Sequence, residues 1–157
     1  MTLTQFYFLF PALFMLHELE EIVWMPSFVK KLSAQFPDIR FLSYYTPFTF
    51  NAIVLEQFLI LLLSLFLSYQ FSNYTIYATI VIAYIYHVFG HLIQTIVLRK
   101  YVPGLLTGSS NELVSSIAYL KIEISSQTLW FLFLTLLVIV LNLVVSFMIL
   151  HKISHKK

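Results

Sequence analysis

Several carboxylate side chains in this sequence occur where they are energetically costly. Of 157 residues only seven are Asp or Glu, and Glu18, Glu20, Glu21 and Glu56 lie within long apolar stretches. A carboxylate at the centre of a bilayer costs about 2.5 to 3.5 kcal/mol on insertion scales, so such residues usually pair, bind an ion or line a wet cavity. Histidines occur in the same stretches, and imidazole together with carboxylate is a ligand set typical of transition metals. The first hypothesis is therefore a buried metal site.

The spacing of the candidate ligands suits ion binding by helices. His17, Glu20 and Glu21 stand at i, i+3 and i+4, which places them on one face of a helix. His87 and His91 stand at i and i+4, the spacing at which two imidazoles bind one ion. The chain has no cysteine. A divalent metal would therefore be bound by nitrogen and oxygen, which favours zinc first and iron second.

The composition indicates which elements must position these residues. Hydrophobic residues make up 60% of the chain, charged residues 10%, and the mean hydropathy is +0.88. These values indicate an integral membrane protein. A hydrocarbon core of about 30 Å requires about 20 apolar residues of helix. Four stretches meet this requirement, near residues 5–26, 48–68, 74–98 and 126–150.

These stretches predict an all-α fold with a single domain over residues 1–157. We expect a polytopic bundle of four transmembrane helices. The stretch between the third and fourth helices is long enough for a short interfacial helix, expected near residues 111–124. The fourth stretch carries Asn142 and small hydroxyls as its polar groups, which is typical of a packing helix.

The depth of the ionisable residues provides a test that is independent of their spacing. Counted from the helix ends at 1.5 Å per residue, the six candidates fall within a layer of about 9 Å. We therefore predict that one ion, or a pair about 3.5 to 4 Å apart, is bound by residues from three helices. The predicted ligands are His17, Glu20, Glu21, Glu56, His87 and His91.

Catalytic roles are predicted for Glu20, Glu21 and Glu56, because six candidates exceed what a four-coordinate zinc with a bound water requires. A carboxylate that is not a ligand could act as general base, and Glu20 is the first choice for this role. Glu18 points about 100° away from His17, so we expect it to be a structural or supporting group.

The basic residues predict the orientation in the membrane. Cytoplasmic loops are enriched in Lys and Arg, and the formal net charge of +2 comes from residues beside the apolar stretches, which gives no indication of nucleic-acid binding. The loops after the first and third stretches should be cytoplasmic, with the metal site in the cytoplasmic half. Four spans then leave the C-terminal lysines on the opposite side. The residues concerned are Lys30, Lys31, Arg40, Arg99, Lys100 and Lys121 in the loops and Lys152, Lys156 and Lys157 in the tail.

Two features near the histidine pair concern access to the site. Gly90 lies between the two histidines, and its missing side chain would let a neighbouring helix or a substrate approach closely. Pro103 and Gly104 predict a turn, and Thr107 follows. The turn either only ends the third helix or forms a lid or substrate-facing loop over the site.

These motifs together resemble a known family. HELEE at residues 17–21, the isolated Glu56, HVFGH at residues 87–91 and the following Pro-Gly with Thr107 are similar to the HXXEE-motif family of small bacterial integral membrane proteins, whose function is unassigned. The resemblance covers about residues 11–108. It implies a metal-dependent enzyme of the bacterial cytoplasmic membrane, with the predicted ligands and the Pro103, Gly104 and Thr107 loop at the family's marked positions.

Three functions fit these observations. The first is an intramembrane metal-dependent hydrolase acting on a lipid-like or amphiphilic substrate, with a mono- or dinuclear site. The second is a di-iron carboxylate oxygenase or desaturase, although such sites usually pair Glu-x-x-His from two helices. The third is a proton- or metal-coupled transporter, which at this length would have to be a homo-oligomer. The expected partners are membrane lipids or a lipid-like substrate.

Overall fold

The computed structural model describes residues 2–39, 42, 45–110 and 126–154 of the chain. Four long helices account for most of them: α1 (Leu3–Gln35), α2 (Pro47–Gln70), α3 (Thr75–Leu98) and α5 (Ser126–Ser154). Residues 105–110 are also helical, and no strand occurs in the described ranges. The predicted all-α fold is confirmed for this part of the chain. The interfacial helix predicted near residues 111–124 lies outside the described residues.

The helix starts follow from local sequence. Thr2 and Gln5 form a capping box at the start of α1, in which each side chain bonds to the backbone N–H of the other. Thr46 caps α2, and Pro47 occupies its first turn. α1 continues past Pro26 to Gln35. The helix thus extends beyond the first apolar stretch, which ended at residue 26, because a proline removes one backbone donor and the rest of a long helix can absorb that loss.

Three of the described helices are long and apolar enough to cross a membrane. They are α2, α3 and α5, with mean hydropathies of 2.1, 1.7 and 2.8. In the α5 span only 6% of the residues are buried, so its apolar side chains need a lipid environment. α1 carries Glu18, Glu20 and Glu21 in its middle and is not among the three. The count of four spans therefore stays a prediction.

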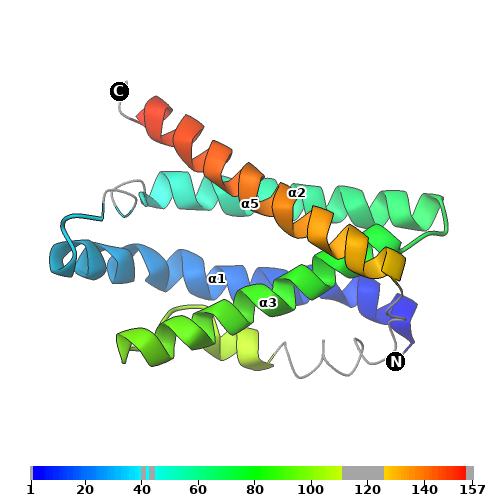
Figure 1. The fold of residues 1–157 in the computed structure, drawn as a ribbon, viewed down its shortest axis with the longest axis horizontal. Coiled ribbons are helices and arrows are strands. Elements are labelled where there is room, and N and C mark those ends of the chain that lie inside the picture. The colour runs from blue at the N-terminus through cyan, green and yellow to red at the C-terminus, as the bar shows by residue number, and fades with distance from the viewer. Residues whose placement is uncertain (1, 40–41, 43–44, 111–125, 155–157) are drawn as a thin grey trace.

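The directions of the helices differ from a simple alternating bundle (Figure 1). α1 and α2 are antiparallel, whereas α3 and α5 begin at the same end of the molecule and run in the same direction. The N-terminus and the end of α5 consequently lie at opposite ends. The ends of α1, α3 and α5 lie at one end of the molecule, which carries Lys30, Lys31, Arg99, Lys100 and Lys152. We call this the basic end.

Two clusters of buried apolar side chains position the site between them along α1. The first contains Phe6 and Phe10 of α1, packed against Tyr77, Val81 and other residues of α3. The second contains Met25 and Val29 of α1, with Phe50, Val54 and Val102. Inside a membrane such packing, rather than the hydrophobic effect, holds helices together. The stretch of α1 between the clusters contains the HELEE segment, so its polar side chains are enclosed from both sides.

Candidate metal centre

Four of the predicted ligands converge in the structure. His17 and Glu21 come from α1, and His87 and His91 come from α3. One ligand atom from each residue lies within 4.8 Å of all the others. His17, Glu21 and His91 are buried, while the side chain of His87 is 48% exposed. The i, i+4 spacing on each helix therefore turns two of the candidate side chains toward the same point. Their binding of an ion stays a prediction.

The distances between these atoms match the geometry of a metal site. Glu21 Oε1 lies 3.2 Å from His17 Nε2, 3.5 Å from His87 Nε2 and 2.7 Å from His91 Nε2. His87 Nε2 lies 3.2 Å from His17 Nε2 and 3.0 Å from His91 Nε2. Four ligands bound tetrahedrally to zinc at about 2.0 to 2.1 Å would lie about 3.3 to 3.4 Å apart. Four of the five observed separations are shorter than that value, by as much as about 0.6 Å, and one is longer.

The hydrogen bonding of the group is incomplete without a cation. Glu21 Oε1 is buried and accepts no hydrogen bond of acceptable geometry from any residue that the structure describes, although three ring nitrogens lie within 3.5 Å of it. An unsatisfied buried carboxylate oxygen is costly. The three Nε2 atoms point toward one another and toward this oxygen. This arrangement suits four atoms that coordinate one metal ion better than it suits a network of hydrogen bonds.

His17 is held in the tautomer that metal binding requires. Its Nδ1 lies 3.0 Å from the carbonyl oxygen of Gly104, and a carbonyl can only accept, so Nδ1 carries the proton. In the neutral ring, Nε2 then keeps its lone pair, which faces Glu21 and His87. Metal-binding histidines commonly donate their other ring N–H in this way, which fixes the orientation of the ring.

Gly104 is required at this position by its surroundings. Its φ is +91°, a conformation that favours glycine. A Cβ atom there would lie 2.6 Å from Glu21 Oε1 and 2.8 Å from His17 Cε1. The predicted turn therefore packs directly against two of the converging residues.

Glu20 points to the segment after α3 rather than to the converging group. Its carboxylate accepts hydrogen bonds from the backbone N–H of Gly104 at 2.9 Å, from the N–H of Thr107 at 2.8 Å and from the Thr107 hydroxyl at 2.6 Å. The Tyr101 hydroxyl also donates to it. Partial burial, and then this bond to Glu20, raises the pKa of Tyr101 to about 12. These hydrogen bonds to Glu20 hold residues 101–107 next to the converging His and Glu side chains. Pro103 is buried within that segment.

Glu56 also lies outside the converging group and bonds to α5. It accepts hydrogen bonds from the Asn142 amide at 2.9 Å and the Ser146 hydroxyl at 2.7 Å, and Gln57 donates to Asn142. Within the described residues, four of the six predicted ligands are therefore brought together, and Glu20 and Glu56 are not. Counting residues along each helix predicts how deep a residue lies in the membrane, but it does not predict the direction in which its side chain points.

Sequence reasoning overlooked two tyrosines near the site. Tyr101 was not singled out, although it follows the third span directly. Tyr45 precedes α2, and burial together with the negative charges of Glu21 and Glu18 raises its pKa. Glu18 is itself buried. Both tyrosines could have been found from the sequence, because each lies next to the end of a predicted span.

The open side of the group lies along α3. Beside the half-exposed His87, a Cβ atom added to Gly90 would meet no described atom within 4 Å. Among the described residues, no neighbouring helix packs on Gly90. The close approach of a neighbouring helix is therefore not seen in the described part of the chain, and the approach of a substrate stays a prediction.

Comparison with known proteins identifies relatives of the chain without assigning a function. The family described as "Protein of unknown function with HXXEE motif" matches residues 8–119. A Bacillus subtilis (strain 168) protein described as "Uncharacterized protein YrkK" is 29% identical over 136 residues, which covers 83% of this chain and 77% of the relative. No solved structure matches the chain.

Proposed function

This chain belongs to the HXXEE-motif family, whose function is unknown, and we propose that it is a metal-dependent membrane enzyme. The observation that carries this proposal is the convergence of three imidazole nitrogens and one carboxylate oxygen within 4.8 Å of one another. His17, Glu21, His87 and His91 would bind the ion. Zinc suits this set best, because nitrogen and oxygen ligands without thiolate and near-tetrahedral spacing are typical of zinc sites.

Hydrolysis of a lipid-like substrate is the reaction that this arrangement supports best. With these four protein ligands, a zinc ion would have to take a water molecule as a fifth ligand, and it would then supply a water of lowered pKa and polarise an ester or amide carbonyl. The half-exposed His87 and the open space beside Gly90 give the side from which substrate would approach. The exposed side chains around it on α3 include Tyr86 and Phe89, so an amphiphile within the bilayer could reach the ion.

The positions of the carboxylates bear on the competing functions. A di-iron carboxylate site uses several Glu residues to bridge two ions, but only one carboxylate joins the converging group among the described residues. This favours a mononuclear site. Glu20 is engaged by the 101–107 segment and Glu56 by α5, so Glu21 is the predicted catalytic carboxylate closest to the proposed ion.

Basic residues support a cytoplasmic location for the segment that covers the site. Lys and Arg are enriched in cytoplasmic loops, and the described ends of α1, α3 and α5 that carry them lie together at the basic end. With α3 and α5 running in the same direction, Lys152 joins Lys30, Lys31 and Lys100. We propose that the basic end faces the cytoplasm of a bacterium, so that Lys152 lies on the same side as the other lysines and the chain between α3 and α5 crosses the membrane once more.

Elemental analysis tests the proposal directly. Protein purified without chelator or nickel resin should contain about one zinc per chain. The double variant His87→Ala, His91→Ala should lose it, whereas His151→Ala, which changes a histidine near the end of α5, should retain it. Equal metal content in the two variants would refute the site. A metal-loaded protein that hydrolyses no amphiphilic ester or amide, yet moves protons or metal across vesicles, would instead be a carrier.

A further inference from the structure

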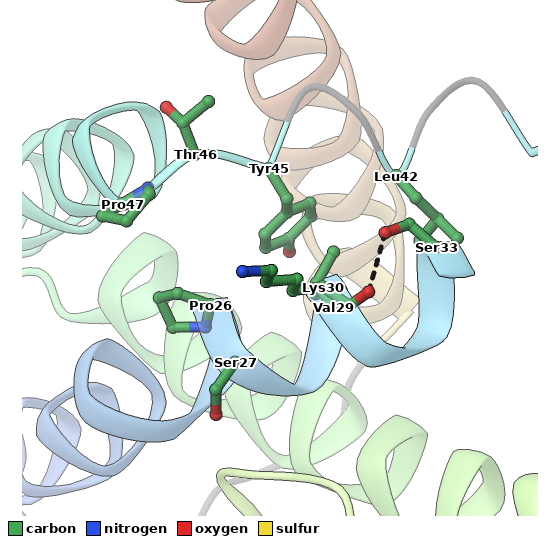
Figure 2. Close-up of a pocket in the computed structure, with 9 residues that line it drawn as sticks. All are labelled: Pro26, Ser27, Val29, Lys30, Ser33, Leu42, Tyr45, Thr46 and Pro47. Carbon is green, nitrogen blue, oxygen red and sulfur yellow. Dashed lines mark hydrogen bonds between the residues drawn. The ribbon is translucent and has the colours of Figure 1, made fainter. Parts of the chain in front are cut away.

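A second concave site lies at the basic end, on the far side of Pro26 from the HELEE segment. It is a cavity of about 440 Å³ between the last turns of α1 and the residues that precede α2. Small-molecule sites typically have volumes of about 300 to 1,000 Å³. Figure 2 shows Pro26 and Lys30 on one side of it and Tyr45, Thr46 and Pro47 on the other. None of the four converging residues of the candidate metal centre lines this cavity.

Lys30 gives the cavity its chemical character. Among the described residues it is the one charged side chain in the lining, and no carboxylate lines the cavity. No salt bridge involves Lys30 within the part of the chain that the structure describes. Its ammonium group extends into the space between Pro26, Tyr45 and Pro47 (Figure 2). An unpaired ammonium beside apolar walls favours an anionic ligand that also has an apolar part.

The hydroxyl groups of the lining are largely used by the protein itself. Ser27 donates to the carbonyl of Trp24 at 2.9 Å, and Ser33 donates to the carbonyl of Lys30 at 3.0 Å. Thr46 caps α2 by accepting from the backbone N–H of Thr49. The Lys30 ammonium is therefore the principal donor that the lining offers to a ligand.

The cavity borders the same buried cluster as the turn over the candidate metal centre. Val29 lines the cavity and belongs to the buried cluster that contains Val102, which directly precedes the Pro-Gly turn over His17. Tyr45 also lines the cavity and is packed against Phe50 and Phe147, with ring centroids 5.6 and 4.9 Å apart. This cluster is closely packed, with Val29 5% and Val102 0% exposed.

Resting on the proposed function, we propose that the cavity binds the phosphate-bearing head group of an anionic amphiphile, with the Lys30 ammonium on the phosphate and Pro26, Val29 and Pro47 against its first carbons. The cavity lies at the basic end, where lipid head groups of a cytoplasmic leaflet would be found, and a lysine near that surface attracts anionic lipids. The occupant is therefore a lipid of the surrounding membrane rather than a free anion.

Titration with short-chain phosphatidic acid tests this inference on the purified full-length protein. Lys30→Gln should weaken binding about tenfold or more, as expected for a charged hydrogen bond. Lys31→Gln is the matched control, since it removes the same charge from the neighbouring residue, which does not line the cavity; its effect should stay below about threefold. Lys30→Arg should retain most of the affinity. Equal losses in Lys30→Gln and Lys31→Gln would overturn the inference.

Two further arms separate the ligand source and the proposed enzyme function. Inorganic phosphate at the same concentration should not displace the lipid; if it does, the occupant is a free anion and the amphiphile is excluded. The His87→Ala, His91→Ala variant should still bind phosphatidic acid in a Lys30-dependent manner. If the wild type contains no metal and yet shows this Lys30 dependence, the proposed enzyme function fails while the lipid site stands.

Discussion

The Nδ1 atom of His17 donates a hydrogen bond to the carbonyl oxygen of Gly104, 3.0 Å away and 87 residues later in the chain. This contact joins the HELEE segment of α1 to the turn that follows α3. With the ring neutral, this contact directs the Nε2 lone pair of His17 toward Glu21 and His87. The turn is therefore part of the candidate metal centre and not only the end of a helix.

Gly104→Ala should reduce metal retention. The added Cβ would lie 2.6 Å from Glu21 Oε1, and the φ of +91° strains any side chain. We expect metal affinity to fall at least about tenfold, by analogy with the loss of other groups that orient metal ligands. Gly90→Ala is the control, because its Cβ meets nothing described within 4 Å and alanine is favoured in a helix. Competition with a zinc chelator measures both, and equal affinities would contradict the role of Gly104.

Glu20→Gln should loosen the segment after α3 without removing the ion. The carboxylate accepts hydrogen bonds from Gly104, Thr107 and Tyr101. The amide of Gln is a weaker acceptor, and its NH₂ group would face the N–H and O–H donors of these residues. Amide hydrogen exchange of residues 101–108 should accelerate about tenfold or more, corresponding to charged hydrogen bonds of about 1.5 to 3 kcal/mol. Metal content should remain near that of the wild type. Loss of metal with unchanged exchange would instead identify Glu20 as a ligand, as the sequence first suggested.

Glu56→Leu should destabilise the packing of α2 on α5 and leave the metal centre intact. Asn142 and Ser146 would lose their acceptor, at a cost of about 1 kcal/mol for an interhelical hydrogen bond in a membrane. Adding Asn142→Leu should recover part of the loss, because both partners are then apolar. Thermal unfolding in detergent measures the stability, and elemental analysis measures the metal. Loss of zinc from the single variant would show that Glu56 is a ligand.

Acidification should release the metal before it loosens the covering segment. Imidazole binds a metal only when deprotonated, so metal affinity should fall as the pH drops below about 6. The covering segment is held by the Glu20 carboxylate as acceptor, and an ordinary carboxyl group protonates only near about pH 4. Tyr101, whose pKa is raised to about 12, stays protonated and able to donate throughout this range. Zinc retention and hydrogen exchange of residues 101–108 can be followed over the same pH range. Metal retained without change to about pH 4 would argue against three histidine ligands.

The membrane orientation can be tested with single cysteines, because the chain has none of its own. Ala34→Cys near the end of α1 and Lys152→Cys near the end of α5 are exposed positions at the basic end, and Gln70→Cys at the end of α2 is exposed at the opposite end. A membrane-impermeant maleimide added to intact cells should label only Gln70→Cys. Labelling of Lys152→Cys but not Ala34→Cys would restore four alternating spans.

Local sequence alone determined the two ligand pairs of the candidate site. His17 with Glu21 and His87 with His91 are four residues apart on helices, and this spacing puts both members of each pair on one helical face whatever the surroundings. The apolar stretches likewise predicted the helices, because only helices satisfy the backbone within lipid.

Tertiary structure decided which carboxylate joins the pairs and what covers them. Glu20 precedes Glu21 by one residue and so faces about 100° away, toward residues 101–107, and Glu56 faces α5. Depth along a helix cannot reveal this, since it leaves rotation about the helix axis undetermined. The shared direction of α3 and α5 and the contact of His17 with Gly104 depend on segments far apart in the chain. Only the packing of whole helices against one another fixes such relationships.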